Sequence, residues 1–299
     1  MARSEFTLPL SLAAGLTLWL VANDWHVLVW MLPMAMYATY VTMEMNNRLA
    51  LIRIRTRIMA SVFWLGLPLL LSPLTNSLST FTDVLAALLL LPATCMLFFT
   101  YGRPDRVLTV FHVFALLGAA AVLCAPLAIF IPLFWLYLII YMRAWTARVF
   151  SASLLGLALA AMLLLVVPGS LDQWSSLDGI LGVQVSARMA LILALGLCAS
   201  IYYVRQSYDD KISIRMMYHV IIWQWLWAQA LALAIPDRAL TLNVATWVFA
   251  TPLISHQIAL SRSRWTTWWL IAVLLAGVAI QVIHHLDIQI LPSLTSSSN

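Results

Sequence analysis

The sequence predicts an all-α protein, a polytopic bundle of about eleven transmembrane helices built from helical hairpins. Of its 299 residues, 64% are hydrophobic and 9% are charged, whereas soluble domains carry about 25% charged residues. Apolar runs recur along the whole chain, and arginines gather in every second connection between them. Because a soluble fold of this size needs a more polar surface, these observations favour a membrane protein.

Eleven apolar segments define the predicted spans. A lipid-facing backbone must satisfy its own hydrogen bonds, so each span is expected to be a helix. Several runs are short for a bilayer, and we expect those helices to extend into the flanking loops. Residues 1–290 are assigned to a single transmembrane domain and residues 291–299 to a disordered external tail. The spans are placed near residues 8–22, 27–43, 58–72, 83–101, 107–123, 126–142, 149–167, 186–204, 216–235, 241–260 and 266–283.

The basic residues set the predicted threading. Of the 16 lysines and arginines, all but Arg188 and Arg238 fall on one side of the predicted bundle. By the positive-inside rule this side faces the cytoplasm. The N-terminus is therefore predicted to be cytoplasmic and, with eleven spans, the C-terminus to be external.

The hairpins share a pattern. Pro92 and Pro132 each precede an arginine, Arg103 and Arg143, by eleven residues. Since a proline within a helix removes a backbone donor and bends the helix, we expect a repeated hairpin with a kinked outgoing helix. Prolines that are simply common in membrane helices are the alternative.

The first cytoplasmic hairpin holds the densest group of arginines. The planar guanidinium suits phosphate, so this hairpin is a candidate site for an anionic lipid or a polyprenyl diphosphate. Three histidines are predicted within about two turns of the same face and could join the site when protonated. The alternative is that the arginines only set the topology. The candidate residues are Arg48, Arg53, Arg55, Arg57, His112, His219 and His256.

A second candidate site lies within the predicted ninth span. Trp223, Gln224 and Trp227 could line a cavity for an isoprenoid or a sugar, because the two tryptophans are four residues apart. Packing against neighbouring helices is the alternative. The acidic run that includes Asp209 and Asp210 is interpreted as a solvated turn.

Few motifs point to an enzyme. All eleven acidic residues fall at span ends or in loops, and the chain lacks metalloprotease, hydrolase and phosphate-loop motifs. The three cysteines show no metal-ligand spacing; Cys95 and Cys198 fall inside predicted spans and Cys124 lies at the boundary between two of them. No catalytic residue, metal or cofactor is therefore assigned.

One resemblance rests on the arginine-rich first hairpin and on the run Tyr-Met-Arg-Ala-Trp-Thr-Ala-Arg at 141–148. In these features the chain resembles uncharacterised bacterial inner-membrane proteins of ten to eleven spans. The resemblance implies a multi-pass fold and carries over no site residue. A carotene-cleaving membrane oxygenase is similar in size, but its iron site needs histidine motifs that this chain lacks.

Three functions remain open at this point. The first is transport or handling of an amphipathic or polyprenyl-linked substrate of the cell envelope. The second is a non-catalytic membrane subunit whose arginine hairpins dock a partner protein. The third, least favoured, is an intramembrane enzyme. The expected partners are membrane lipids, including anionic or polyprenyl lipids, and a membrane protein; the basic residues lie in hairpin tips, which argues against nucleic acid.

Overall fold

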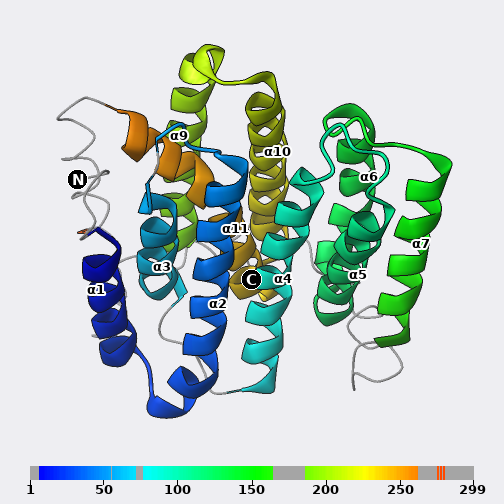
Figure 1. Cartoon of the computed structure of the whole chain (residues 1–299). Coiled ribbons are helices and arrows are strands. Elements are labelled where there is room, and N and C mark those ends of the chain that lie inside the picture. Colours follow the sequence, from blue (N-terminus) through cyan, green and yellow to red (C-terminus); the bar gives the residue numbers. More distant parts are fainter. Residues whose placement is uncertain are drawn as a thin grey trace, which may run out of the picture.

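The structure is a computed structural model that describes residues 7–54, 56–71, 77–163 and 186–261, together with 275, 277 and 279. In these ranges the chain is all-α, as predicted, with ten α-helices joined by short 3₁₀ turns (Figure 1). The α-helices are α1 (Thr7–Ala22), α2 (Trp25–Leu49), α3 (Ile58–Leu71), α4 (Leu78–Phe98), α5 (Val107–Leu123), α6 (Phe130–Ile140), α7 (Ala147–Met162), α9 (Ala187–Gln206), α10 (Ile212–Ala234) and α11 (Ala239–Leu260). The 3₁₀ turns are η1 (Ala125–Ile129), η3 (Ser207–Asp209) and η4 (Pro236–Arg238).

Local sequence explains where several of these helices begin and end. Ser77, Thr146 and Ser186 each precede a helix and accept a hydrogen bond from a backbone N–H of its first turn. Such caps satisfy donors that have no partner within the helix. Helix α2 ends at Leu49. Its C-cap residue Ala50 has a φ of 50°, in the left-handed region, and donates its N–H to the carbonyl of Asn46.

The helices run alternately in opposite directions, so that every second connector lies at the upper end of the molecule in Figure 1. These connectors are residues 50–57, 99–106, 141–146 and 207–211. Gly102 N–H donates to the carbonyl of Met142 at 2.8 Å, which joins two of them directly. The described basic residues other than Arg188 and Arg238 lie in these four connectors or in the adjoining helix turns.

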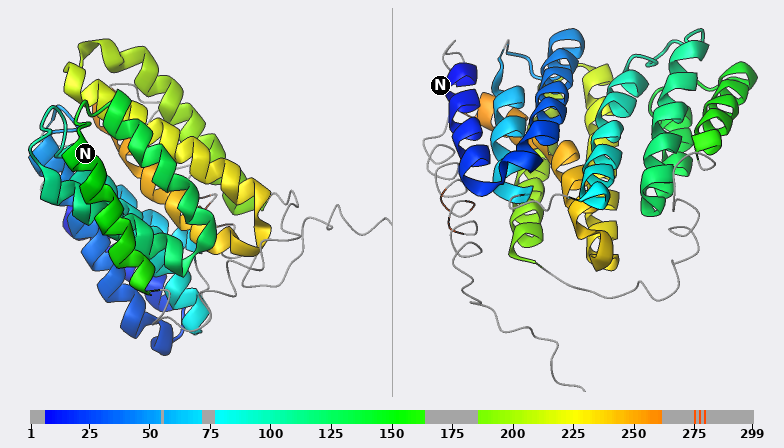
Figure 2. Two further views of the ribbon diagram at one scale, coloured as in Figure 1. Left: turned by 90° about the vertical axis from the view of Figure 1, so that its right-hand side faces the viewer. Right: turned by 90° about the horizontal axis from the view of Figure 1, so that it is seen from below.

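Helix α11 lies at the centre of the bundle. It contacts α3, α4, α9 and α10, and the two further views show α9 and α10 along one flank of it (Figure 2). Every residue from Thr241 to His256 is buried. A helix buried on all sides is typical of a core element, and the indole of Trp247 donates to the carbonyl of Phe63 across the contact with α3.

The exterior of the bundle is unusually apolar. Large exposed hydrophobic side chains occur on α1, α2, α6, α7, α9 and α10, with several of them one helical turn apart. Contiguous exposed apolar surface of this kind marks a membrane or protein interface. Examples are Leu10, Val21, Val29, Met36, Leu155, Leu159, Met162, Ile201, Val204 and Leu226.

The prediction of eleven spans is wrong for the helices that the structure describes. Three are long and apolar enough to cross a membrane, namely α2, α4 and α9 with its η3 extension. A fourth span is added if α10 and α11, bent by 117° at their junction, are counted as one. The other described helices, namely α1, α3, α5, α6 and α7, coincide with predicted spans but are apolar helices too short to count as spans.

For α1, α3, α5, α6 and α7, length is the physical reason for the lower number. Helix α3 has 14 residues and α5 has 17, which correspond to about 21 Å and 26 Å at 1.5 Å per residue. The hydrocarbon core of a bilayer is about 30 Å thick. The predicted span 266–283, apart from three helical residues, and the predicted tail 291–299 lie outside the described residues.

Candidate functional site

Charged side chains from three parts of the chain meet at the upper end of the bundle. Arg53, in the connector after α2, places its Nε 2.5 Å from Asp210 Oδ1 and its Nη1 3.5 Å from Asp209 Oδ2. Its Nη2 also donates to the carbonyl of Gln206 at 3.5 Å. The Arg53 side chain is 33% exposed, whereas that of Asp210 is fully buried. One guanidinium therefore joins the first connector to the end of α9.

The other carboxylate oxygen of Asp210 faces the core. His256 of α11 places Nε2 3.4 Å from Asp210 Oδ2, and both side chains are fully buried. The rings of Tyr203 and Tyr218 stack on each other at 4.2 Å, and each meets the imidazole edge-on at 4.9 Å and 5.1 Å. Within the described part of the chain, neither tyrosine hydroxyl has a hydrogen-bond partner.

The connector that carries Arg53 is held in place by one buried asparagine. Asn46 donates from Nδ2 to the carbonyl of Thr56 at 3.1 Å, and its Oδ1 accepts from the N–H of Ile52 at 3.0 Å. Together with the left-handed Ala50, these bonds fix both ends of the loop. These bonds hold the backbone of the connector in the position from which the Arg53 side chain reaches the C-terminal end of α9.

The Arg53–Asp210–His256 cluster is best understood as an anchor. The Arg53 guanidinium already faces the carboxylates of Asp209 and Asp210, so its N–H donors are not free to bind a phosphate. A carboxylate beside an imidazole can act as an acid–base pair. However, neither Asp210 nor His256 lines the adjacent hollow of about 450 Å³, whose walls are Tyr202, Arg205, Gln206, Tyr208 and Asp209.

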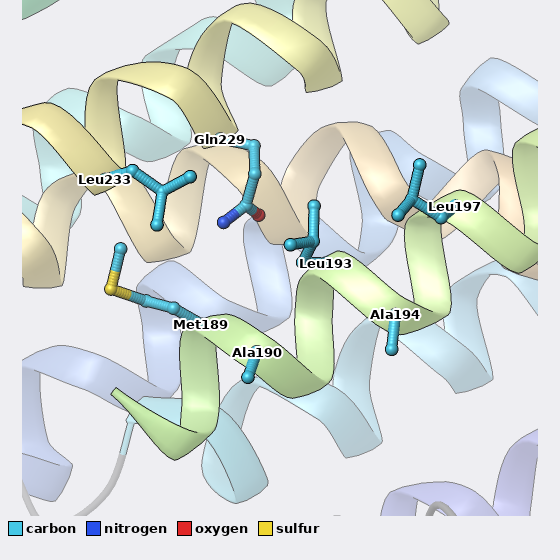
Figure 3. Close-up of a pocket in the computed structure, with 7 residues that line it drawn as sticks. All are labelled: Met189, Ala190, Leu193, Ala194, Leu197, Gln229 and Leu233. Carbon is cyan, nitrogen blue, oxygen red and sulfur yellow. The ribbon is translucent and has the colours of Figure 1, made fainter. Parts of the chain in front are cut away.

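A second volume lies between α9 and α10. This groove of about 430 Å³ is lined by apolar side chains and by one polar residue, Gln229 (Figure 3). Gln229 is 3% exposed, and within the described residues neither its amide nitrogen nor its amide oxygen has a hydrogen-bond partner. We refer to this volume as the α9–α10 groove; its lining residues are Met189, Ala190, Leu193, Ala194, Leu197, Gln229 and Leu233.

The predicted phosphate-site residues lie in different surroundings. Arg48 pairs with Glu44 at 2.5 Å on the surface of α2. His112 and His219 are exposed and bond to backbone carbonyls one turn earlier on their own helices. Arg57 is exposed at the start of α3. Arg55 lies outside the described residues.

Of the predicted group, the structure brings Arg53 and His256 together, through Asp210. Phosphate binding by the seven residues stays a prediction.

The predicted cavity residues do not share one face. Trp223 and Trp227 are 46% and 38% exposed, whereas Gln224 is fully buried and donates from Nε2 to Thr94 Oγ1 at 3.1 Å. They line neither of the two volumes described above. Their cavity-lining role stays a prediction.

Two residues of these sites were missed at the sequence level. Asp210 was interpreted as part of a solvated turn, but its side chain is buried and bonded to Arg53. Gln229 lies five residues after Gln224 on the same helix. An uncharged polar residue within an apolar run is the signal that could have singled it out.

No group of three or more histidine, cysteine, aspartate or glutamate side chains in the described ranges is arranged to hold a metal ion. Comparison of the chain with protein-family models, with curated proteins and with solved structures gives no match to any of them. The resemblance to multi-pass inner-membrane proteins therefore stays a prediction.

Proposed function

We propose that this chain is a multi-pass protein of the bacterial inner membrane that binds and handles an amphipathic lipid or a polyprenyl-linked substrate of the cell envelope. The apolar exterior of α1, α2, α7, α9 and α10 supports the membrane location, because it would be exposed to water in a soluble protein. The gathering of basic residues at one end supports a cytoplasmic orientation for that end.

The α9–α10 groove carries the lipid-handling part of the proposal. Its volume of about 430 Å³ falls within the range of about 300–1,000 Å³ that is typical of small-molecule sites. Its walls are aliphatic, and it lies between two helices whose outer faces are themselves apolar. Such a groove suits a hydrocarbon or isoprenoid chain, whereas a transporter of polar solutes would need a polar lining.

Lipid retention by matched variants tests this function. Ala194 lines the groove and Ala158 lies on the exposed face of α7, so Ala194→Trp fills the groove and Ala158→Trp adds the same side chain elsewhere. Native mass spectrometry of the detergent-purified chain should show lipid adducts for the wild type and for Ala158→Trp, and loss of the adducts for Ala194→Trp. Equal adducts in all three proteins would contradict lipid binding in this groove.

Orientation is tested separately. Reporter fusions after Arg106, Arg148 and Lys211 should score cytoplasmic, because each follows a connector at the basic end. A fusion after Asp237, at the opposite end beside η4, should score external. Opposite results at any two of the basic sites would overturn the proposed threading.

A non-catalytic subunit that docks a partner protein is the second candidate. The close packing of α5 against α7 favours it: a Cβ added to Gly156 would lie 2.4 Å from the carbonyl oxygen of Phe111, so the two backbones nearly touch. A rigid bundle of this kind needs no substrate to be stable. Co-purification of one stoichiometric membrane protein, retained by Ala194→Trp, would favour this alternative over lipid handling.

A further inference from the structure

We propose that the α9–α10 groove takes a lipid alcohol, meaning a long fatty or isoprenoid chain that ends in a hydroxyl group, and that Gln229 binds the hydroxyl. This inference rests on the proposed function, since it names the chemical class of the lipid that the groove holds. It is carried by Gln229 together with the shape and the lining of the groove.

Gln229 is a buried amide without a partner in the described part of the protein. Its carboxamide extends from α10 towards Leu193 of α9, at the floor of the groove (Figure 3). Both polar atoms are covered, and neither makes a hydrogen bond. A buried amide without hydrogen bonds destabilises the protein unless a ligand supplies the bonds.

Gln224, five residues earlier on α10, is the matched comparison: its Nε2 has a partner, whereas its Oε1 has none within the described residues. Its Nε2 donates to Thr94 Oγ1 of α4 at 3.1 Å, and the residue is fully buried away from the groove. Gln229 faces the aliphatic side chains of α9 instead. The two glutamines therefore differ in whether a neighbouring helix offers a partner for the amide nitrogen.

The chemistry of the amide selects the ligand group. A carboxamide offers two N–H donors and one carbonyl acceptor, and a hydroxyl can accept from Nε2 and also donate to Oε1. An ester carbonyl or a carboxylate can only accept, and an ammonium can only donate. The remaining lining residues carry no charge that would hold an ionic headgroup. A hydroxyl is therefore the simplest single group that satisfies both atoms.

The position of Gln229 fits a chain that enters from one end. It lies five residues before the end of α10 at Ala234, which is about 7.5 Å along the helix axis. That depth is near the boundary between the headgroup layer and the hydrocarbon core if α10 ends at the membrane surface. The chain of the ligand then extends along α9 towards Leu197, the residue of the groove farthest from that end.

Access to the amide requires a small movement. Leu193 and Leu233 are half-buried and stand beside the carboxamide. Binding requires these two leucines to change rotamer, so that Nε2 and Oε1 become accessible to the ligand.

Three probes of similar chain length test the inference: hexadecan-1-ol, methyl palmitate and hexadecane. Each is titrated against the full chain in mild detergent, and binding is measured by native mass spectrometry. We expect the wild type to prefer the alcohol to the ester and to the alkane by about tenfold, the scale of one hydrogen bond. In Gln229→Leu the preference should vanish, while binding of hexadecane is retained.

The variants distinguish the possible failures. Loss of binding of all three probes in Ala194→Trp, with no preference for the alcohol in the wild type, would overturn the inference and leave lipid handling intact. Unchanged binding of all three in Ala194→Trp would overturn both. A dimer of the wild type that is lost in Gln229→Leu would assign the amide to pairing between two copies of the chain, and this also would overturn the inference. Gln229→Leu is expected to fold, because it removes an amide without partners in the described structure.

Discussion

Removal of the Asp210 carboxylate is the perturbation whose effect the structure defines best. Asp210→Asn keeps the shape of the side chain but removes the charge that faces Arg53 Nε at 2.5 Å and His256 Nε2 at 3.4 Å. The neighbouring Asp209 is a matched control, because it is an acid that faces the same guanidinium at 3.5 Å with a side chain that is 67% exposed.

The magnitude follows from burial. A hydrogen bond to a charged group contributes about 1.5–3 kcal/mol, and breaking a fully buried pair costs about 3–5 kcal/mol. Arg53 is one-third exposed and keeps its contact with Asp209, so screening by solvent reduces the effect. We expect Asp210→Asn to lower the free energy of unfolding by about 2–3 kcal/mol, and Asp209→Asn by less than about 1 kcal/mol.

Equilibrium unfolding in mixed micelles, followed by circular dichroism, measures both variants against the wild type. The single variant Arg53→Met and the double variant Arg53→Met/Asp210→Asn complete a double-mutant cycle, which should show a coupling of about 1–3 kcal/mol. If Asp209→Asn lowers the free energy of unfolding as much as Asp210→Asn does, Arg53 and Asp210 do not anchor the connector. A coupling energy between Arg53 and Asp210 that is indistinguishable from zero would have the same meaning. Either result would mean that the connector and the end of α9 are held together by other contacts.

Two further predictions concern packing and buried polar groups. Gly156→Ala should destabilise the bundle by about 1–3 kcal/mol, because the new Cβ would lie 2.4 Å from the carbonyl oxygen of Phe111 and forces α5 and α7 apart; unchanged thermal unfolding would contradict this contact. Gln224→Leu should destabilise by about 1–2 kcal/mol because it leaves Thr94 without its donor, whereas Gln229→Leu should leave the unfolding free energy unchanged or raise it. The reverse order of the two glutamine variants would contradict the assignment of their surroundings.

The helices themselves could be predicted from the sequence. The ten described helices coincide with the first ten predicted segments, because each apolar run is bounded by polar or turn-forming residues such as Ser77 and Thr146. The number of membrane spans could not be predicted. Hydropathy locates an apolar helix in the sequence, but it does not fix the residue at which the helix ends, and so it does not fix the length of the helix. Helix α5, for example, ends at Leu123 without the extension into the following loop that was expected.

The candidate sites could be predicted only in part from the sequence. Arg53 and Asp210 are 157 residues apart, and only the folded bundle brings the two together. The run Tyr208 to Lys211 has the composition of a solvated turn, and the fold buries its second acid while it leaves Tyr208 exposed. Similarly, nothing in the local sequence distinguishes Gln224, which finds Thr94, from Gln229, which faces an apolar groove.

Photo-crosslinking at the groove tests the central claim most directly. Leu197 lines the α9–α10 groove and is 43% exposed, and Leu155 lies on α7 and is 64% exposed. A benzophenone amino acid at each position is irradiated in native membranes, and the attached lipids are identified by mass spectrometry. Lipid handling in the groove predicts that one lipid class is enriched at position 197 and that position 155 gives the bulk lipid composition. The same bulk composition at both positions would contradict a specific lipid in the groove.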